Sequence, residues 1–150
     1  MGPTRAYTPA ARAPAEACAP GPVRGRYRAH VELFAHRHAV VIPAGIGLRH
    51  PRENDLGRIE QARCRAPIRT LDPTGVVEFD RADLRLSDLF AVWGQPYDDE
   101  RLLSFRGPTE VFAAGRRVTG DVPLRDRAQL VVELGGFIPP HRSFNFPPRG

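Results

Sequence analysis

The chain has 150 residues and a mass of 16.6 kDa, which is the size of one ordinary domain. Hydrophobic residues make up 41% and charged residues 26%, close to globular averages, which argues against disorder throughout the chain. Sixteen prolines and fourteen glycines argue against a helix bundle, because helix interiors tolerate neither residue well. No apolar run approaches the roughly 20 residues of a membrane-spanning helix, so we expect no transmembrane segment.

The formal net charge is +5, and all 22 basic residues are arginine. The absence of lysine excludes Schiff-base chemistry and a phosphate-binding P-loop. A basic balance favours nucleic acid or another acidic partner. However, arginines alternate with carboxylates, as in residues 81–85 and 124–127, which indicates a mixed solvated surface. No helix-turn-helix, basic-helix or zinc-finger pattern occurs, so nucleic-acid binding is not expected.

The chain begins with a segment of unusual composition. Residues 1–26 are rich in Pro, Ala, Gly and Arg and show no periodicity, which predicts a disordered arm. Apolar and polar residues then alternate over residues 30–35, which predicts a strand. Residues 38–42 return as a second strand that Pro43 ends, with residues 36–37 as the turn of a first hairpin.

A second hairpin and a helix follow. Residues 67–71 and 76–79 are predicted strands, and the Pro and Gly between them, at 72–75, suit a turn. The next apolar residues fall at helical spacing and predict one buried face of a short helix: Leu86, Leu89, Phe90 and Trp93. Ser87 is predicted to cap its start and Gly94 to end it.

The remaining elements are predicted in the same way. The polar residues 50–61 read as a surface loop. A third hairpin is predicted from residues 109–113 and 116–118, and a last strand from residues 129–134, where two glycines follow. Together the elements predict a small α+β fold: a mixed or antiparallel sheet of hairpins with one short amphipathic helix, in a β-grasp-like order.

A single domain is expected over residues 27–136, and a Pro- and Phe-rich tail over residues 137–150. The tail is predicted to lie along the domain and to cover a sheet edge, with Phe144 and Phe146 packed against it. The alternative is that its prolines form a polyproline ligand for a partner.

The two cysteines, Cys18 and Cys64, do not form a CxxC pair. Their spacing favours a disulfide that ties the arm to the domain, which requires an oxidising compartment. Residues 1–12 lack the apolar stretch of a signal peptide, so either a signal has been removed or the protein stays inside the cell. The alternative is two free thiols, with the Cys64 thiolate stabilised by Arg63 and Arg65 as a candidate nucleophile.

Three segments, at residues 30–34, 41–47 and 86–94, resemble a group of uncharacterised secreted or lipid-anchored actinobacterial proteins. The resemblance spans residues 27 to 135, and typical members have a histidine-rich opening and a His-Thr-His-Asp turn. Their histidines look like a metal site, so the resemblance implies metal binding in the group.

This sequence departs from that pattern. The opening histidines are replaced by Arg26 and Arg28, which leaves His30, and the turn reads Arg-Thr-Leu-Asp over residues 69–72. A further histidine position of the group is Glu78. The resemblance therefore implies the scaffold without most of its metal ligands.

A partial metal site nevertheless stays an alternative. Two histidines, His36 and His38, lie across the first turn, and His30 lies on the same strand face as His36 by period two. Copper or zinc needs three or four converging ligands, and Asp72 or Glu78 would complete the set. The competing interpretation is that these histidines are exposed polar residues of a hairpin.

We therefore expect a secreted or cell-surface domain, not an enzyme, that binds a protein or cell-surface partner or has a structural role, and is a monomer. No serine elbow or glycine-rich phosphate loop occurs, and no cofactor is expected beyond copper or zinc in the metal alternative. A further alternative is an arginine-rich cytoplasmic domain that binds an acidic partner.

Overall fold

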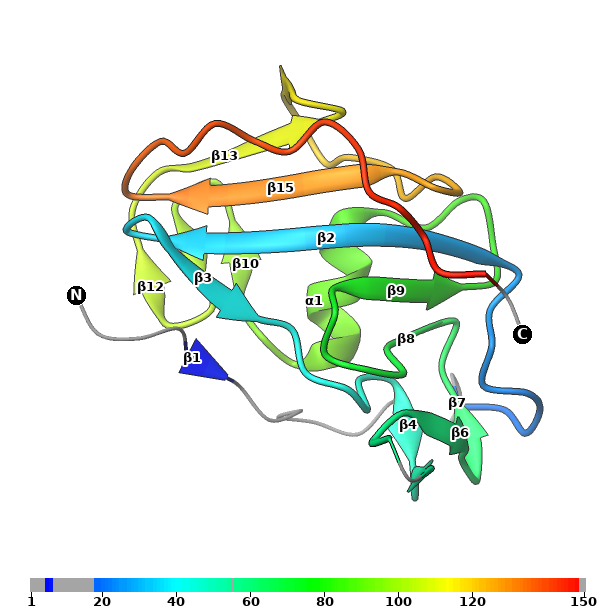
Figure 1. Cartoon of the computed structure of the whole chain (residues 1–150). Helices are drawn as coiled ribbons and strands as arrows, with labels where there is room; N and C mark the ends of the chain where they lie inside the picture. The colour runs from blue at the N-terminus through cyan, green and yellow to red at the C-terminus, as the bar shows by residue number, and fades with distance from the viewer. Residues whose placement is uncertain (1–4, 7–17, 55, 149–150) are drawn as a thin grey trace.

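The computed structural model describes residues 5–6, 18–54 and 56–148 (Figure 1). Most of the ordered structure is β, with one short helix in the described chain. The elements are β1 (Arg5–Ala6), β2 (Tyr27–Ala35), β3 (His38–Val41), β4 (Leu48–Arg49), β5 (Arg52–Glu53), β6 (Ile59–Gln61), β7 (Cys64–Arg65), β8 (Ile68–Arg69), β9 (Val76–Phe79), α1 (Leu86–Trp93), β10 (Tyr97–Asp98), β11 (Arg101–Leu102), β12 (Phe105–Arg106), β13 (Thr109–Ala113), β14 (Arg116–Val118) and β15 (Gln129–Leu134).

The main sheet is mixed, and β2 lies at its centre (Figure 1). β2 runs parallel to β15, with Leu33 opposite Val132. On the far side of β15, the sheet continues antiparallel through β13 to β14. The first half of β2 pairs antiparallel with β9, its second half pairs antiparallel with β3, and β8 and β1 extend these two arms. A mixed sheet built from hairpins with one short helix is what the sequence predicted.

The three predicted hairpins are present as β2–β3, β8–β9 and β13–β14. In the first, His36 and Arg37 take positive φ values of 51° and 67°, as a tight two-residue turn between twisted antiparallel strands requires. The predicted surface loop over residues 50–61 is instead partly a two-stranded ribbon of β5 and β6. The sequence did not predict that pairing, because this polar segment has no alternating apolar pattern in either short strand.

The helix α1 packs its apolar face against the sheet, as predicted. Leu86, Leu89, Phe90 and Trp93 are buried, and Trp93 is 0% exposed. Gly94, with φ 79°, ends the helix in the left-handed conformation that favours glycine. No helix in the described part of the chain has the length and apolarity needed to cross a bilayer.

The predicted cap at Ser87 is wrong. The helix begins one residue earlier, at Leu86, and the backbone N–H of Arg85 donates to the Asp88 carboxylate at 2.8 Å. Ser87 instead donates its hydroxyl to Asp121 at 2.5 Å, and its backbone N–H donates to the same carboxylate at 3.2 Å. A carboxylate from a distant loop therefore accepts from the backbone N–H of Ser87 in the first turn, which local sequence does not reveal.

The segment from Cys18 to Arg26 lies against the domain, in contrast to the arm expected over residues 1–26; most of the earlier part of that arm lies outside the described residues. Cys18 and Cys64 form a disulfide, with Cα atoms 5.3 Å apart. Val23 is 5% exposed and packs with Leu48, Ile59 and Leu71 in a second apolar cluster, separate from the main core.

Arg69 fastens the same segment to the sheet. Its guanidinium is 0% exposed, and its Nε and Nη2 donate to the backbone carbonyls of Val23 and Arg24, at 2.5 and 2.7 Å. It also donates to both carboxylate oxygens of Asp80, at 2.6 and 3.1 Å. A third carbonyl, that of Ala66, accepts at 3.1 Å, so the buried charge is paired and its donors are satisfied.

Candidate functional site

One face of the main sheet is polar, although it is largely buried. Side chains alternate across a strand. Every second residue of β2 and β15, including Val31, Leu33, Leu130 and Val132, therefore packs in the main core, and the intervening residues, Phe34 and Val131 among them, point the other way. The second set includes Arg28, His30, Gln129 and Glu133, which are 8%, 6%, 4% and 2% exposed. The C-terminal segment covers this face by turning back over β15 and crossing β2 (Figure 1).

A chain of hydrogen bonds crosses this polar face. His30 Nδ1 contacts Gln129 Oε1 at 2.7 Å, and Gln129 Nε2 donates to Glu32 Oε1 at 2.7 Å. The same carboxylate oxygen contacts Nδ1 of His141, from the C-terminal segment, at 2.8 Å. At the other end, His30 Nε2 contacts the carbonyl oxygen of Thr74 at 2.9 Å. The strand register creates this chain, because His30 and Gln129 are paired across β2 and β15.

The contacts of His30 hold its ring in place between β15 and the turn before β9. Since the amide of Gln129 donates to Glu32, it presents its oxygen to the imidazole, and Thr74 presents another oxygen. Both ring nitrogens therefore lie within hydrogen-bond distance of an oxygen atom. Gly75, with φ 87°, makes the close approach of Thr74 feasible, because a Cβ there would lie 2.5 Å from the Val31 carbonyl oxygen.

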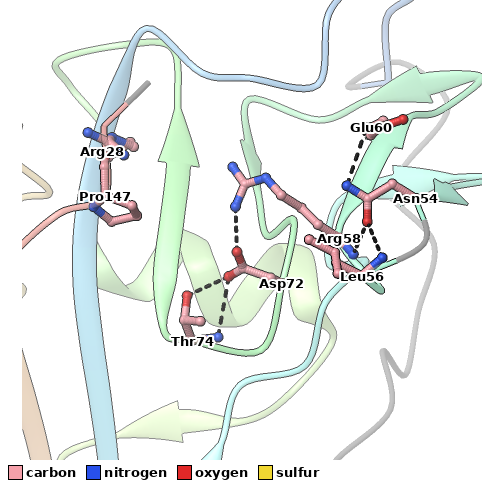
Figure 2. A network of polar contacts seen from close by, with 8 residues as sticks. All are labelled: Arg28, Asn54, Leu56, Arg58, Glu60, Asp72, Thr74 and Pro147. Atoms are coloured by element: carbon pink, nitrogen blue, oxygen red, sulfur yellow. Dashed lines mark hydrogen bonds and ion pairs between the residues drawn. The ribbon is translucent and has the colours of Figure 1, made fainter. Parts of the chain in front are cut away.

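Aromatic contacts attach the C-terminal segment to the same face. The ring of Phe144 stacks on His30, with centroids 3.7 Å apart and planes within 7°. Phe146 lies between two guanidinium groups, 5.4 Å from that of Arg28 and 5.1 Å from that of Arg127. Arg28 Nη1 also donates to the carbonyl oxygen of Pro147 at 2.7 Å, and Figure 2 shows these two residues side by side.

Glu133 lies where the C-terminal segment leaves β15. Its Oε1 accepts from the backbone N–H of Ile138 at 3.1 Å, while its Oε2 is buried without a hydrogen-bond partner in the described chain. Burial raises the pKa of Glu133 above its ordinary value, and the nearby Glu110 raises it further, against the lowering effect of the Ile138 N–H. The fold therefore favours the neutral acid at this position.

The metal alternative required His30, His36 and His38 to converge, and the structure does not bring them together. Both nitrogens of His30 contact protein oxygens. The ring of His36 packs over Gly135 and against the edge of Phe105, at 6.0 Å, and His38 lies on β3 beyond the turn. Across residues 5–6, 18–54 and 56–148, no three His, Cys, Asp or Glu side chains are grouped as metal ligands.

Asp72 and Glu78, which the sequence offered as further ligands of a metal site, have other roles in the structure. Asp72 pairs with Arg58 at 2.5 Å and accepts hydrogen bonds from the backbone N–H and hydroxyl of Thr74. Glu78 is 2% exposed and accepts from the backbone N–H of Gly25 at 2.8 Å. Both therefore fix the turn and the N-terminal segment in place.

A second candidate is a recess of about 470 Å³ beside the disulfide-linked segment. Its lining is apolar at Val23, Ile59 and Leu71, and charged at Arg24, Arg58 and Glu60. Figure 2 shows Arg58 extended toward Asp72, which holds one of its nitrogens, and the Arg58 side chain as a whole is 39% exposed.

The loop that carries Arg58 is itself fixed by Asn54. The side-chain oxygen of Asn54 accepts from the backbone N–H groups of Leu56 and Arg58, at 2.9 and 3.0 Å. Its amide nitrogen donates to Glu60 at 3.2 Å (Figure 2). An asparagine that binds its own downstream backbone is a standard turn former, so the loop geometry follows from this residue.

Two further groups bear on chemistry. Because Cys64 is bonded to Cys18, it has no free thiol, and the alternative of a Cys64 nucleophile is not supported. Tyr97 stacks on Phe90 with centroids 4.4 Å apart, and burial, followed by the charges of Asp121, Asp99 and Asp98, raises its pKa to about 12. Its hydroxyl therefore stays neutral across the physiological range.

The sequence analysis gave no binding role to four residues that help to build the two candidates, namely Glu32, Arg28, Gln129 and Arg58. A signal was present for one of them, since Gln129 and Glu133 interrupt an otherwise apolar strand. The arginines gave no such signal, because all the basic residues of the chain are arginine. Comparisons with protein-family models, curated proteins and solved structures gave no match, so function is argued from the geometry of this chain.

Proposed function

We propose that the chain is an exported, non-enzymatic binding domain on a β-grasp-like scaffold. The scaffold assignment is supported by the parallel central pair of β2 and β15, with a hairpin on each side and α1 against one face. Export is supported by the disulfide of Cys18 and Cys64, because such bonds persist in oxidising compartments. The neighbourhood of that disulfide is where we place the ligand.

The observation that carries this proposal is the recess between residues 22–24 on one side and residues 54 and 58–60 on the other, with the guanidinium of Arg58 held at its side by Asp72. A guanidinium that is fixed by one carboxylate keeps further donors for a ligand carboxylate or phosphate. The apolar lining from Val23, Ile59 and Leu71 favours a hydrocarbon part on the same ligand. The ligand class is therefore a small organic anion with an apolar body.

Benzoate is a suitable probe, and benzylamine is its cationic counterpart of nearly the same shape. We expect benzoate to shift the backbone amide signals of residues 22–24 and 54–60 in NMR titrations, and Arg58→Gln to abolish these shifts. Arg63→Gln is the matched control, because Arg63 is an exposed arginine on the same part of the chain. Reduction of the disulfide should weaken binding, since residues 22–24 would lose their covalent attachment.

Three results would contradict the proposal. The first is that benzoate shifts amides near arginines throughout the chain. The second is that benzylamine binds the recess as well as benzoate, which would assign the affinity to Glu60 or to the apolar lining. The third is that Arg58→Gln retains binding, which would show that benzoate binds without the Arg58 guanidinium.

A further inference from the structure

We propose that the polar face of β2 and β15 is a peptide-recognition site, which the C-terminal segment, residues 137–148, occupies in cis. Its ligand class is an extended peptide with two phenylalanines separated by one residue and followed by proline. The segment itself has this pattern in Phe144-Asn145-Phe146-Pro147. The proposal is independent of the recess at Arg58.

The face is organised without the segment that covers it. The bonds that join His30 to Gln129, Gln129 to Glu32, and His30 to Thr74 involve only residues of the sheet and the adjacent turn. If the segment left, these bonds would remain, whereas Arg28 and Glu133 would lose their contacts with Pro147 and Ile138. The segment also contacts an apolar side chain of the sheet, because Phe137 lies against Phe112 with ring centroids 5.9 Å apart.

The segment is attached by side-chain contacts at separate points. No hydrogen bond between backbone groups joins residues 137–148 to the rest of the described chain. Its polar contacts are those of Ile138 with Glu133, His141 with Glu32, and Pro147 with Arg28. A segment outside the strand ladder leaves and returns without breaking the sheet.

The sites that receive the two phenylalanines are chemically distinct. Phe144 is stacked on the imidazole of His30, with the two ring planes within 7° of parallel. Phe146 is held between Arg28 and Arg127, and the same Arg28 donates to the carbonyl that follows. Alternate residues of an extended chain point the same way, so two phenylalanines separated by one residue reach both sites. The prolines that follow favour this extended conformation.

The segment does not fill the site. A recess of about 220 Å³ remains beside Phe144 and Phe146, bordered by the small side chains of Ala113, Ala114 and Ala128. A cis segment also benefits from its tether, which gives an effective concentration in the millimolar range. A peptide from another chain therefore binds only when the cis contacts are weakened.

The test uses the full-length chain with Phe144→Ala and Phe146→Ala together, and a fluorescent synthetic peptide that corresponds to residues 140–148. In fluorescence anisotropy we expect the double variant to bind this peptide saturably, at least about tenfold more tightly than the wild-type chain does. The same peptide with both phenylalanines replaced by alanine should not bind. Adding Arg28→Gln to the double variant should weaken binding at least about tenfold, whereas adding Arg106→Gln, an exposed arginine on β12, should not.

The proposal is overturned if the double variant and the wild type bind the peptide equally, or if neither binds at millimolar peptide. It is also overturned if the double variant loses cooperative unfolding, because the segment is then a structural cover. Binding that Arg28→Gln leaves unchanged would place the peptide elsewhere and would equally contradict the assignment.

Discussion

The sheet–helix core and the lobe around the disulfide are stabilised in different ways. In the core, β2, β15 and α1 bury large apolar side chains against one another. In the lobe, which we define as residues 18–24, 44–54 and 56–66 with Leu71, the buried apolar cluster consists of Val23, Leu48, Ile59 and Leu71. Four such side chains provide little apolar burial, so the lobe depends on covalent and polar links.

Those links converge on the N-terminal side of the lobe. The disulfide fixes Cys18, and the Arg69 guanidinium fixes the carbonyls of Val23 and Arg24. Small structural units that cannot bury enough apolar surface commonly use cross-links of this kind. We therefore expect a destabilising substitution in the core to affect the whole domain, and one in the lobe to affect the lobe alone.

The largest effect is expected in the core, from Trp93→Ala. Trp93 is 0% exposed and stacks near Phe90, with ring centroids 6.0 Å apart. Its truncation should lower the free energy of unfolding by about 3–5 kcal/mol, measured by urea denaturation. Trp93→Phe, which keeps most of the volume, should cost clearly less, and a loss below about 1 kcal/mol for the alanine variant would contradict the core assignment.

A smaller and more local effect is expected in the lobe from Arg69→Met. The substitution leaves the Asp80 carboxylate and three carbonyls without their donor, which should cost about 3 kcal/mol. In hydrogen exchange, protection should fall mainly at residues 18–26, while β2 and β15 stay protected. Arg81→Met is the control, since Arg81 is largely exposed and pairs only with exposed Asp83. An equal loss of protection across the sheet would show that core and lobe are one unit.

The smallest effect is expected from Glu133→Gln, on the polar face of the core. The pKa of Glu133 is raised in the folded state, so its contribution to stability is complete at low pH and is lost as pH rises from 4.5 through the folded-state pKa. Glutamine does not ionise, so the variant should be more stable than the wild type at pH 7, with the difference vanishing toward pH 4. Urea denaturation across this range measures it, with exposed Glu100→Gln as the control. If the free energies of unfolding of the wild type and Glu133→Gln changed in parallel with pH, the pKa of Glu133 would be the same in the folded and unfolded states, which would contradict the prediction.

The sequence predicted the core better than the sites, for a physical reason. Apolar periodicity identifies α1 and the main strands, because burial of Leu33 or Trp93 is a property of each residue and its near neighbours. The polar face depends on the pairing of His30 with Gln129 in a parallel register that no local pattern encodes. The order at residues 18–26 was missed for the same reason, since Arg69 acts on a segment more than 40 residues away.

The parallel pairing of β2 with β15 also has a consequence for synthesis. His30 and Gln129 are neighbours in the sheet but 99 residues apart in the chain. The ribosome releases the central strand of the sheet long before the neighbour that completes it, so the nascent chain holds β2 with one open edge until the last strand emerges. Folding is then a late, whole-chain event governed by a long-range contact, which is the slow class of topology. A chain of this topology therefore stays incompletely folded until β15 has been added.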